Sequence, residues 1–259
     1  LIDVKDDGSI HLNMKYFAFT HDKVMTNDKF SKLFGIPPKK KHDETLQIHF
    51  DIGASAQKVL EEIILKMAQH VYKKTRMKNL CFGGGVALNG VANYNLLKNG
   101  PFDNIHIPPS PGDGGSAVGC AQYSYYIHHS QKKNIENNPS VTIRENVYVG
   151  PSYTNEEIRK FLDSNKVSYE KLDEQSLLEK TAKLISEGNI VGWYQGKMEW
   201  GPRALGNRSI LADPRDAKMK DILNEKIKHR ESFRPFAPSI LEEYVSEYFD
   251  IDITSPYML

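Results

Sequence analysis

The spacing of hydrophobic residues changes from a period of two to a longer period within the first 72 residues. Apolar and polar side chains alternate over residues 10–19, and this alternation predicts a strand. Over residues 51–72 the apolar side chains recur every three or four positions, which predicts a long helix with Asp51 as its N-cap. We expect seven residues on its apolar face: Val59, Leu60, Ile63, Ile64, Met67, Ala68 and Val71.

Two strand–turn–helix units follow this helix in the sequence. The first is a strand over 79–82, the turn Gly83-Gly84-Gly85 and a helix that we expect to end near Leu97. The second is a strand over 105–107, the turn Gly112-Asp113-Gly114-Gly115 and a helix over 116–127. This order is typical of α/β domains, in which helices cover a sheet.

A polar stretch rich in Asn and Lys, residues 131–139, interrupts the periodic pattern, and we place a domain boundary there. The predicted domains are residues 1–135 and 140–259. The second domain is also expected to be α/β, with strands over 147–149, 190–194 and 209–212. Its helices are expected to begin at a Thr154–Glu157 capping box, near Ser176 and at Asp216 as a cap.

Composition narrows the class of protein. A hydrophobic fraction of 39%, a charged fraction of 26% and a net charge of +1 indicate a soluble globular protein without a surface for nonspecific nucleic-acid or membrane binding. We find no apolar run that could cross a bilayer and no secretory signal, so we expect a cytoplasmic protein. Cys81 and Cys120 are expected to be buried free thiols, and the ends at Leu1 and Leu259 suggest a fragment of a longer protein.

The most specific candidate chemistry lies after residue 200, where Arg203 and Arg208 stand in a segment framed by glycine and proline. A guanidinium presents a planar fork of donors that matches phosphate oxygens. Lys228 and Arg230 would point the same way in an extended segment. We expect these four cations to converge on one buried anion pocket, walled by Phe233, Pro235, Phe236 and Pro238. Arg215 is instead expected to pair with a neighbouring carboxylate, and Glu199, Asp213 and Asp216 are close in sequence.

The two glycine turns suggest a nucleotide and a metal. Glycines before a helix allow backbone amides to approach an anion, so Gly83-Gly84-Gly85 and Asn89 predict a nucleotide contact. A tight connection without ligand, with Asn89 merely exposed, is the alternative. Asp113 is either a helix N-cap or an oxygen ligand of a divalent metal. Its turn fits Gly-x-Gly-x-x-Ala, but the expected acidic residue of a dinucleotide fold is missing about 20 residues on.

These motifs resemble the NodU/TobZ-type O-carbamoyltransferases. The matching segments are residues 51–62, 82–89, 111–115, 196–215 and 228–239, in the family's order over nearly the whole chain. The resemblance implies the second half of an actin/Hsp70-like ATPase domain followed by a partial YrdC-like α/β domain. The family's metal-binding histidines belong to an N-terminal half that this chain does not contain.

The resemblance also implies a reaction. The YrdC-like part would form carbamoyl adenylate from carbamoyl phosphate and ATP, and the ATPase-like part would pass the carbamoyl group to the hydroxyl of a small-molecule acceptor, such as a sugar or natural product. By position, Gly83, Gly84, Gly85 and Asn89 would contact ATP, which carries Mg²⁺, and Asp113 would ligate a metal, with iron expected. The catalytic cations Arg203, Arg208, Lys228 and Arg230 would hold carbamoyl phosphate and the adenylate phosphate.

Two other hypotheses stay open at this point. A sister carbamoylation system, as in tRNA modification or hydrogenase maturation, uses the same two modules. A non-catalytic nucleotide-binding module would keep the fold without the chemistry. The sequence leaves the acceptor open, and a homodimer is compatible with it. Nucleic-acid and membrane partners are not expected.

Overall fold

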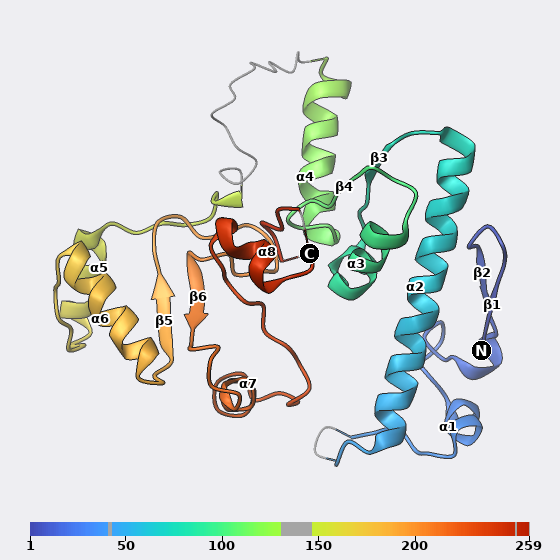
Figure 1. Cartoon of the computed structure of the whole chain (residues 1–259), viewed down its shortest axis with the longest axis horizontal. Coiled ribbons are helices and arrows are strands. Elements are labelled where there is room, and N and C mark those ends of the chain that lie inside the picture. The colour runs from blue at the N-terminus through green and yellow to red at the C-terminus, as the bar shows by residue number, and fades with distance from the viewer. Residues whose placement is uncertain (41–42, 131–146, 252, 259) are drawn as a thin grey trace. The chain divides into compact units, whose positions relative to one another are not determined.

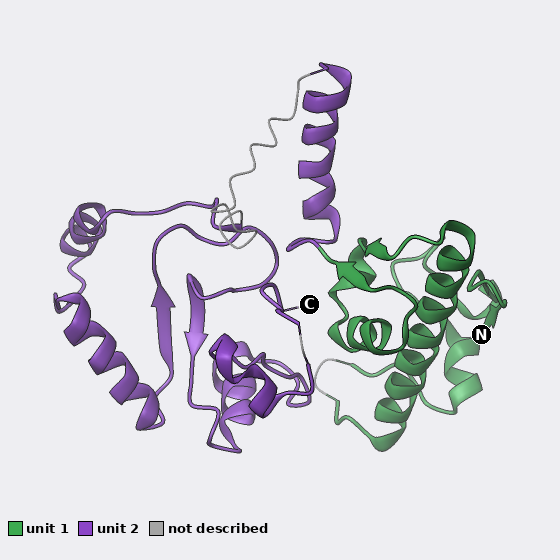
Figure 2. Cartoon of the chain, turned by 45° about the horizontal axis from the view of Figure 1, so that its top comes forward, with its two compact units in different colours: residues 1–107 green, residues 108–259 purple. Residues whose placement is uncertain are grey.

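The computed structural model describes residues 1–40, 43–130, 147–251 and 253–258. These residues divide into two compact units, Leu1–Ile107 and Pro108–Leu259 (Figure 2). Each unit is a mixture of helices and small two-stranded sheets, which agrees with the predicted α/β class. The boundary that we predicted over 131–139 lies outside the described residues.

The first unit opens with a short antiparallel hairpin. Its strands are β1 (Ile2–Val4) and β2 (Ile10–Leu12), with Ile2 opposite Leu12. The strand predicted over 10–19 is therefore too long, because the Asn13 side chain accepts a hydrogen bond from the Lys15 amide and starts the 3-10 turn η1 (Met14–Tyr16). Helix α1 (Asp28–Phe34) follows and ends at Gly35 in the left-handed conformation.

Helix α2 (Gln47–Thr75) is longer than predicted, and Asp51 is not its N-cap. Asp51 lies one turn inside the helix, where it accepts a hydrogen bond from Gln47. The helix begins earlier because the Leu46 amide donates to His49 Nδ1 at 2.9 Å, which satisfies one of the exposed amides at the helix start. Ile63, Ile64 and Ala68 are buried, whereas Met67 and Val71 are exposed, so the apolar face is narrower than predicted.

The core of the first unit holds the first glycine turn in place. Strands β3 (Asn79–Cys81) and β4 (Asn104–His106) pair in parallel, and α3 (Gly90–Asn99) follows the turn as predicted. Helices α2 and α3 lie beside this sheet (Figure 1). Their side chains meet in one apolar cluster. Its buried members are Ile64, Ala68, Ala92, Leu96 and Phe102. Cys81 is exposed, so its predicted burial is wrong.

The second unit carries all of the predicted site cations. Its regular elements are α4 (Asp113–Tyr123) with the π-helix η3 (Ser124–His128), α5 (Asn155–Ser164), α6 (Glu174–Ser186), the strands β5 (Val191–Tyr194) and β6 (Arg208–Leu211), α7 (Met219–Ile222) with the π-helix η5 (Leu223–Lys228), and η6 (Glu242–Tyr244) with α8 (Val245–Tyr248). The capping box of Thr154 and Glu157 is present at α5.

Three local predictions for this unit are wrong. Residues 147–149 form no strand, because Val147 instead pairs its carbonyl with the Trp200 amide of a loop. Asp216 precedes α7 without capping it: its side chain accepts from the Lys218 amide, and Lys218 takes the N-cap position. Cys120 is exposed. Among the described residues, no helix combines the length and the apolar character that a membrane span requires.

Candidate functional site

The segment with Arg203 is the connection of a β-hairpin, and we name residues 195–208, which include the first residue of β6, the arginine loop. Strands β5 and β6 pair antiparallel, with Tyr194 opposite Arg208, so the base of the loop is closed. The Gln195 amide donates to the Asn207 carbonyl at 3.0 Å, just beyond the strands. Gly201 and Gly206 have φ values of 113° and 105°, which other residues rarely adopt. The glycines therefore shape this loop, as the sequence predicts.

A buried carboxylate lies inside the arginine loop. The Glu199 side chain is 0% exposed, and its Oε1 atom accepts three backbone hydrogen bonds, from Leu205 (2.7 Å), Asn207 (2.6 Å) and Arg208 (3.1 Å). Burial acts to raise the pKa of this carboxyl, but the surrounding backbone N–H donors outweigh it and hold the pKa of Glu199 below its ordinary value. Sequence reasoning treated Glu199 only as a possible ion-pair partner and missed this role.

The arginines of this region differ in their surroundings. The Nε atom of Arg208 lies 4.0 Å from Glu199 Oε2, and its side chain is 47% exposed. Arg203 is half-buried, with a buried Nε atom. Arg215 forms hydrogen bonds to both carboxylate oxygens of Asp213, which confirms the ion pair expected for it. Arg208 thus lies beside the buried carboxylate of the loop, and Arg215 is held by a separate carboxylate.

The second cation segment is organised by a buried asparagine that sequence reasoning missed. Asn224 is fully buried; its side chain donates to the carbonyls of Ser232 and Arg234. Its Oδ1 atom accepts a hydrogen bond of 2.7 Å from Arg230 Nε. The guanidinium of Arg230 also lies 4.8 Å from the centre of the Phe236 ring. Arg230 is therefore held against the chain that follows it.

Two expectations for this segment are wrong. Lys228 ends the π-helix η5 and His229 adopts the left-handed conformation, so the segment is not extended and the alternate spacing does not align Lys228 with Arg230. Phe233, Pro235 and Pro238 are exposed, and only Phe236 of the predicted wall is partly buried. Arg208 lies 4.0 Å from Glu199, and Arg230 is hydrogen-bonded to Asn224, each within its own segment. Their convergence with Arg203 and Lys228 on one pocket stays a prediction.

The first glycine turn leaves its backbone accessible. Gly83, Gly84 and Gly85 are exposed, and Gly84 has a φ of 99°. A Cβ atom built at Gly84 or Gly85 would find no atom within 4 Å, so a ligand could approach the peptide groups there. This geometry fits the predicted backbone contact with a nucleotide.

Asn89 has a defined structural role after this turn. It is the N-cap of α3 and accepts a hydrogen bond of 3.0 Å from the Ala92 amide. Its side-chain amide also donates to Gln57 of α2 at 2.8 Å, and Gln57 in turn donates to Glu61 at 2.9 Å. Asn89 is therefore not merely an exposed polar residue, and Gln57 is a partner that the sequence did not reveal.

Residues 109–110 lie between the second glycine turn and the arginine loop. The N-cap of α4 is Gly112 and Asp113 is the first helical residue, so the N-cap alternative for Asp113 is wrong. A Cβ atom at Gly115 would lie 2.0 Å from the Ser110 carbonyl oxygen, and one at Gly201 would lie 2.8 Å from that of Pro109. The backbone of 109–110 thus packs tightly between the turn and the loop, although we predicted them in different domains.

Asp113 is a single carboxylate and would need further ligands to hold a metal ion. The Asp113 side chain is exposed, and a search of those residues finds no group of three His, Cys, Asp or Glu side chains that could hold a metal ion. Asp113 can therefore supply one oxygen ligand, and the remaining ligands would come from elsewhere. The prediction of a metal there stays open.

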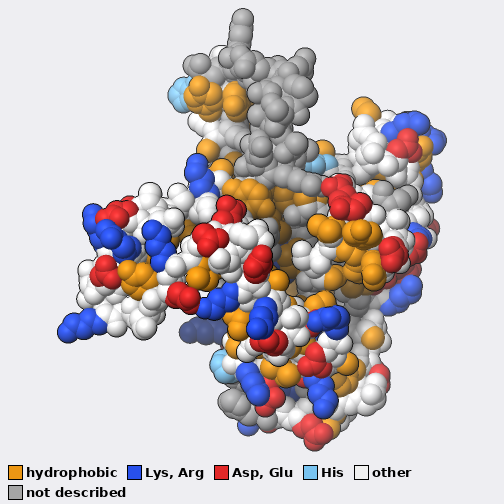
Figure 3. Space-filling view, turned by 60° about the vertical axis from the view of Figure 1, so that its left-hand side comes forward, with side chains coloured by type: hydrophobic (Ala, Val, Ile, Leu, Met, Phe, Trp, Pro, Cys, Tyr) orange, Lys and Arg blue, Asp and Glu red, His pale blue; other side chains and the backbone are white. Residues whose placement is uncertain are grey.

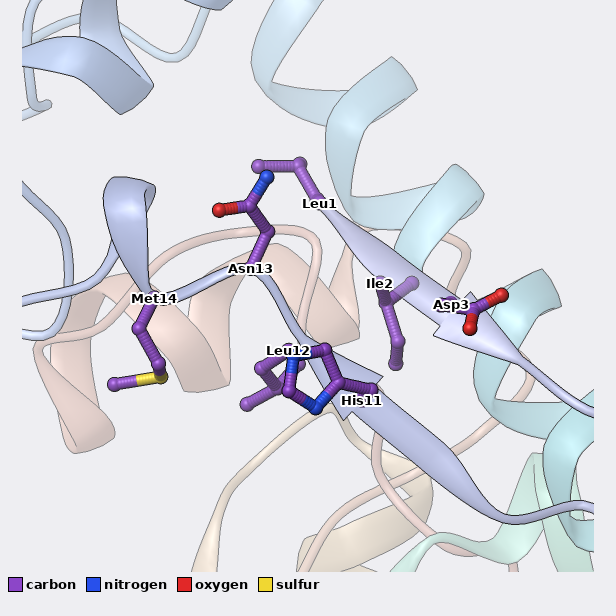
Figure 4. Close-up of a pocket in the computed structure, with 7 residues that line it drawn as sticks. All are labelled: Leu1, Ile2, Asp3, His11, Leu12, Asn13 and Met14. Carbon is purple, nitrogen blue, oxygen red and sulfur yellow. The ribbon is translucent and has the colours of Figure 1, made fainter.

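Two other features of the surface are a cavity and the charge pattern of one face. A cavity between β1, β2 and Met14 (Figure 4) contains none of the predicted site residues. The face shown in Figure 3 carries Lys and Arg side chains interspersed with Asp and Glu. The charges on this face therefore form no single basic field.

Comparison with known proteins identifies the family. Residues 1–122 match the family model described as carbamoyltransferase N-terminus, and residues 182–259 match carbamoyltransferase C-terminus. Protein sll1178 of Synechocystis sp. is 46% identical over 261 residues, which is 100% of this chain and 42% of that protein. Nodulation protein NolO of Bradyrhizobium diazoefficiens is 40% identical, over 85% of this chain and 39% of its own length.

Nodulation protein U of Rhizobium tropici is 35% identical over 78% of this chain and 31% of its own length. The chain thus spans less than half the length of these relatives. The two family models, matched in order, include every predicted site residue: the glycine turns lie in the N-terminal match and the cations in the C-terminal match. The resemblance stated from the motifs is confirmed, and the chain belongs to the carbamoyltransferase family of enzymes.

Proposed function

We propose that this carbamoyltransferase is an ATP-dependent O-carbamoyltransferase. It forms carbamoyl adenylate from carbamoyl phosphate and ATP and passes the carbamoyl group to the hydroxyl of a small-molecule acceptor. Residues 1–135 are the C-terminal portion of an actin/Hsp70-like ATPase domain in this proposal, and residues 140–259 belong to a YrdC-like domain. The nucleotide would lie at Gly83, Gly84, Gly85 and Asn89, and the phosphates at the arginine loop.

The proposed reaction has three steps. Water releases inorganic phosphate from carbamoyl phosphate and leaves carbamate. A carbamate oxygen then attacks the α-phosphorus of ATP, the bond between the α-phosphorus and its bridging oxygen breaks, and pyrophosphate leaves. Finally, the acceptor hydroxyl attacks the carbamoyl carbon, loses its proton, and AMP leaves. In each step a phosphate-bearing group leaves with negative charge on its oxygens, so positioned cations are the main requirement of the protein.

The arginine loop is the observation that carries this proposal. Backbone pairing closes the base of the loop, and Glu199 accepts three backbone amides inside it, so the backbone that carries Arg203 and Arg208 has a defined course. Half of the Arg208 side chain remains exposed and can donate to an anion. An ordered loop of this kind loses little conformational entropy when it binds phosphate groups.

The glycine turn offers open backbone to a nucleotide, whereas Asp113 offers a single carboxylate to a metal. The open backbone at Gly84 and Gly85 fits a phosphate group, which peptide amides can bind directly. Mg²⁺ would accompany ATP as part of the substrate. The described residues supply only Asp113 for a resident metal, with iron expected, so we assign that metal no part in the steps above.

The test is ATP–pyrophosphate exchange that depends on carbamoyl phosphate. Arg203→Ala is expected to lower this exchange by a factor of about 100 to 1,000, which is typical when one donor to a developing charge is removed. Arg159→Ala is the matched control, because Arg159 is an exposed arginine of α5 paired with Glu156. Unchanged exchange in Arg203→Ala would refute the assignment, and circular dichroism would show that both variants fold.

A further inference from the structure

Glu199 is the most deeply buried carboxylate beside the proposed phosphate site, with 0% of its side chain exposed. We propose that Glu199 is a positioning residue that holds the arginine loop in its anion-binding shape, and that it acts through the backbone of 205–208 and through Arg208. This inference deepens the proposed function and rests on it for the identity of the bound anion.

Three backbone hydrogen bonds of the arginine loop point at the same atom. One oxygen atom, Glu199 Oε1, accepts the amides of Leu205, Asn207 and Arg208 at 2.6–3.1 Å. Three amides from the returning half of the loop, residues 202–208, therefore donate to one carboxylate oxygen in the outgoing half, which leaves β5. These hydrogen bonds define the course of the backbone between Leu205 and Arg208.

The outgoing half of the loop, residues 195–201, is itself bonded to the rest of the unit. The Met198 amide donates to the Pro151 carbonyl at 2.9 Å, and the Trp200 amide donates to the Val147 carbonyl at 2.6 Å. Gly201 packs so closely on the Pro109 carbonyl that a Cβ atom there would lie 2.8 Å from its oxygen. Glu199 thus ties the returning half of the loop to a rigid base.

The second carboxylate oxygen of Glu199, Oε2, lies near Arg208. Within the described part of the chain, Glu199 Oε2 is buried without a hydrogen-bond partner, which is unfavourable for a carboxylate unless a charge lies nearby. The nearby charge is the Arg208 guanidinium, whose Nε lies 4.0 Å away. The carboxylate thereby orients Arg208 on one side, while about half of that side chain faces solvent and is available to an anion.

The test compares Glu199→Gln with a matched control, Asp213→Asn. Asp213 is also a buried carboxylate, but it pairs with Arg215 and accepts no amide of the arginine loop. Three quantities are measured: the affinity for inorganic pyrophosphate by calorimetry, the exchange rates of the amides of 205, 207 and 208, and the KM and kcat of carbamoyl-phosphate-dependent ATP–pyrophosphate exchange.

Glu199→Gln is expected to weaken pyrophosphate binding about tenfold to a hundredfold and to raise KM for carbamoyl phosphate, as misplaced supporting groups do. The three loop amides should exchange faster in this variant, and Asp213→Asn should stay within about twofold of the wild type in binding. If Glu199→Gln does not fold, Glu199→Asp, which keeps the charge but shortens the side chain, should show the same loss of binding.

The outcomes separate this inference from the proposed function. Wild-type affinity and wild-type amide exchange in a folded Glu199 variant would overturn the positioning role, even if the exchange reaction is present. Absence of carbamoyl-phosphate-dependent exchange in the wild type would overturn the proposed function, whereas a Glu199-dependent pyrophosphate site would still support the positioning role.

Discussion

Replacing Asn89 with alanine separates a structural role from a nucleotide-binding role at the first glycine turn. Asn89 caps α3 by accepting the Ala92 amide at 3.0 Å, and loss of such a cap costs about 1 kcal/mol. The substitution also leaves the partly buried Gln57 without the Asn89 hydrogen bond of 2.8 Å, which costs about 1 kcal/mol more. We therefore expect Asn89→Ala to lower the free energy of unfolding by about 2 kcal/mol.

The assay is urea unfolding followed by circular dichroism, with Asn89→Asp as the companion variant. An aspartate caps a helix as well as asparagine, so this variant should lose less than about 1 kcal/mol. It adds a negative charge beside the turn that we assign to ATP, and ATP binding should therefore fall sharply although the fold is kept. The cap would be refuted by wild-type stability in Asn89→Ala, and the nucleotide contact by wild-type ATP affinity in Asn89→Asp.

Two further predictions concern the stability of the two units. Leu96 is 2% exposed in the core beside β3, so Leu96→Ala should lower the free energy of unfolding by about 2–5 kcal/mol; a loss under about 1 kcal/mol in urea titrations would contradict this packing. The hydrogen bonds and charge of Arg215 lower the pKa of Asp213 from 3.8 to about 2, so the carboxylate stabilises the fold above pH 3.8 and loses this effect as the pH falls to about 2. Melting temperatures of the wild type and Asp213→Asn should differ at pH 5 and converge near pH 2; a constant difference across this range would exclude the ion pair as its cause.

The sequence predicts those elements whose causes lie within a few residues. The glycine turn between β3 and α3 follows from a short apolar strand that meets three glycines, and the start of α5 follows from Thr154 and Glu157. The start of α2 was misplaced because two signals compete there. Asp51 is a good capping residue, but the hydrogen bond of His49 begins the helix a turn earlier.

The candidate site shows why a residue's role is harder to predict than its chemistry. Arg203 and Arg208 are visible in the sequence because guanidinium groups between glycines are unusual. Glu199 and Asn224 are not visible, because their partners are backbone amides and carbonyls that any sequence contains. The extended shape expected for Lys228 to Arg230 failed for a related reason: Asn224 turns this segment back by bonding to residues after it.

The most direct test of the proposed reaction is mass spectrometry of a reaction that contains the protein, ATP and carbamoyl phosphate without an acceptor. The proposal predicts a product with the mass of carbamoyl adenylate together with pyrophosphate, both missing when carbamoyl phosphate is left out and both depleted in Arg203→Ala. ATP that stays intact, or is cleaved only to ADP and phosphate, would contradict adenylate formation at this site.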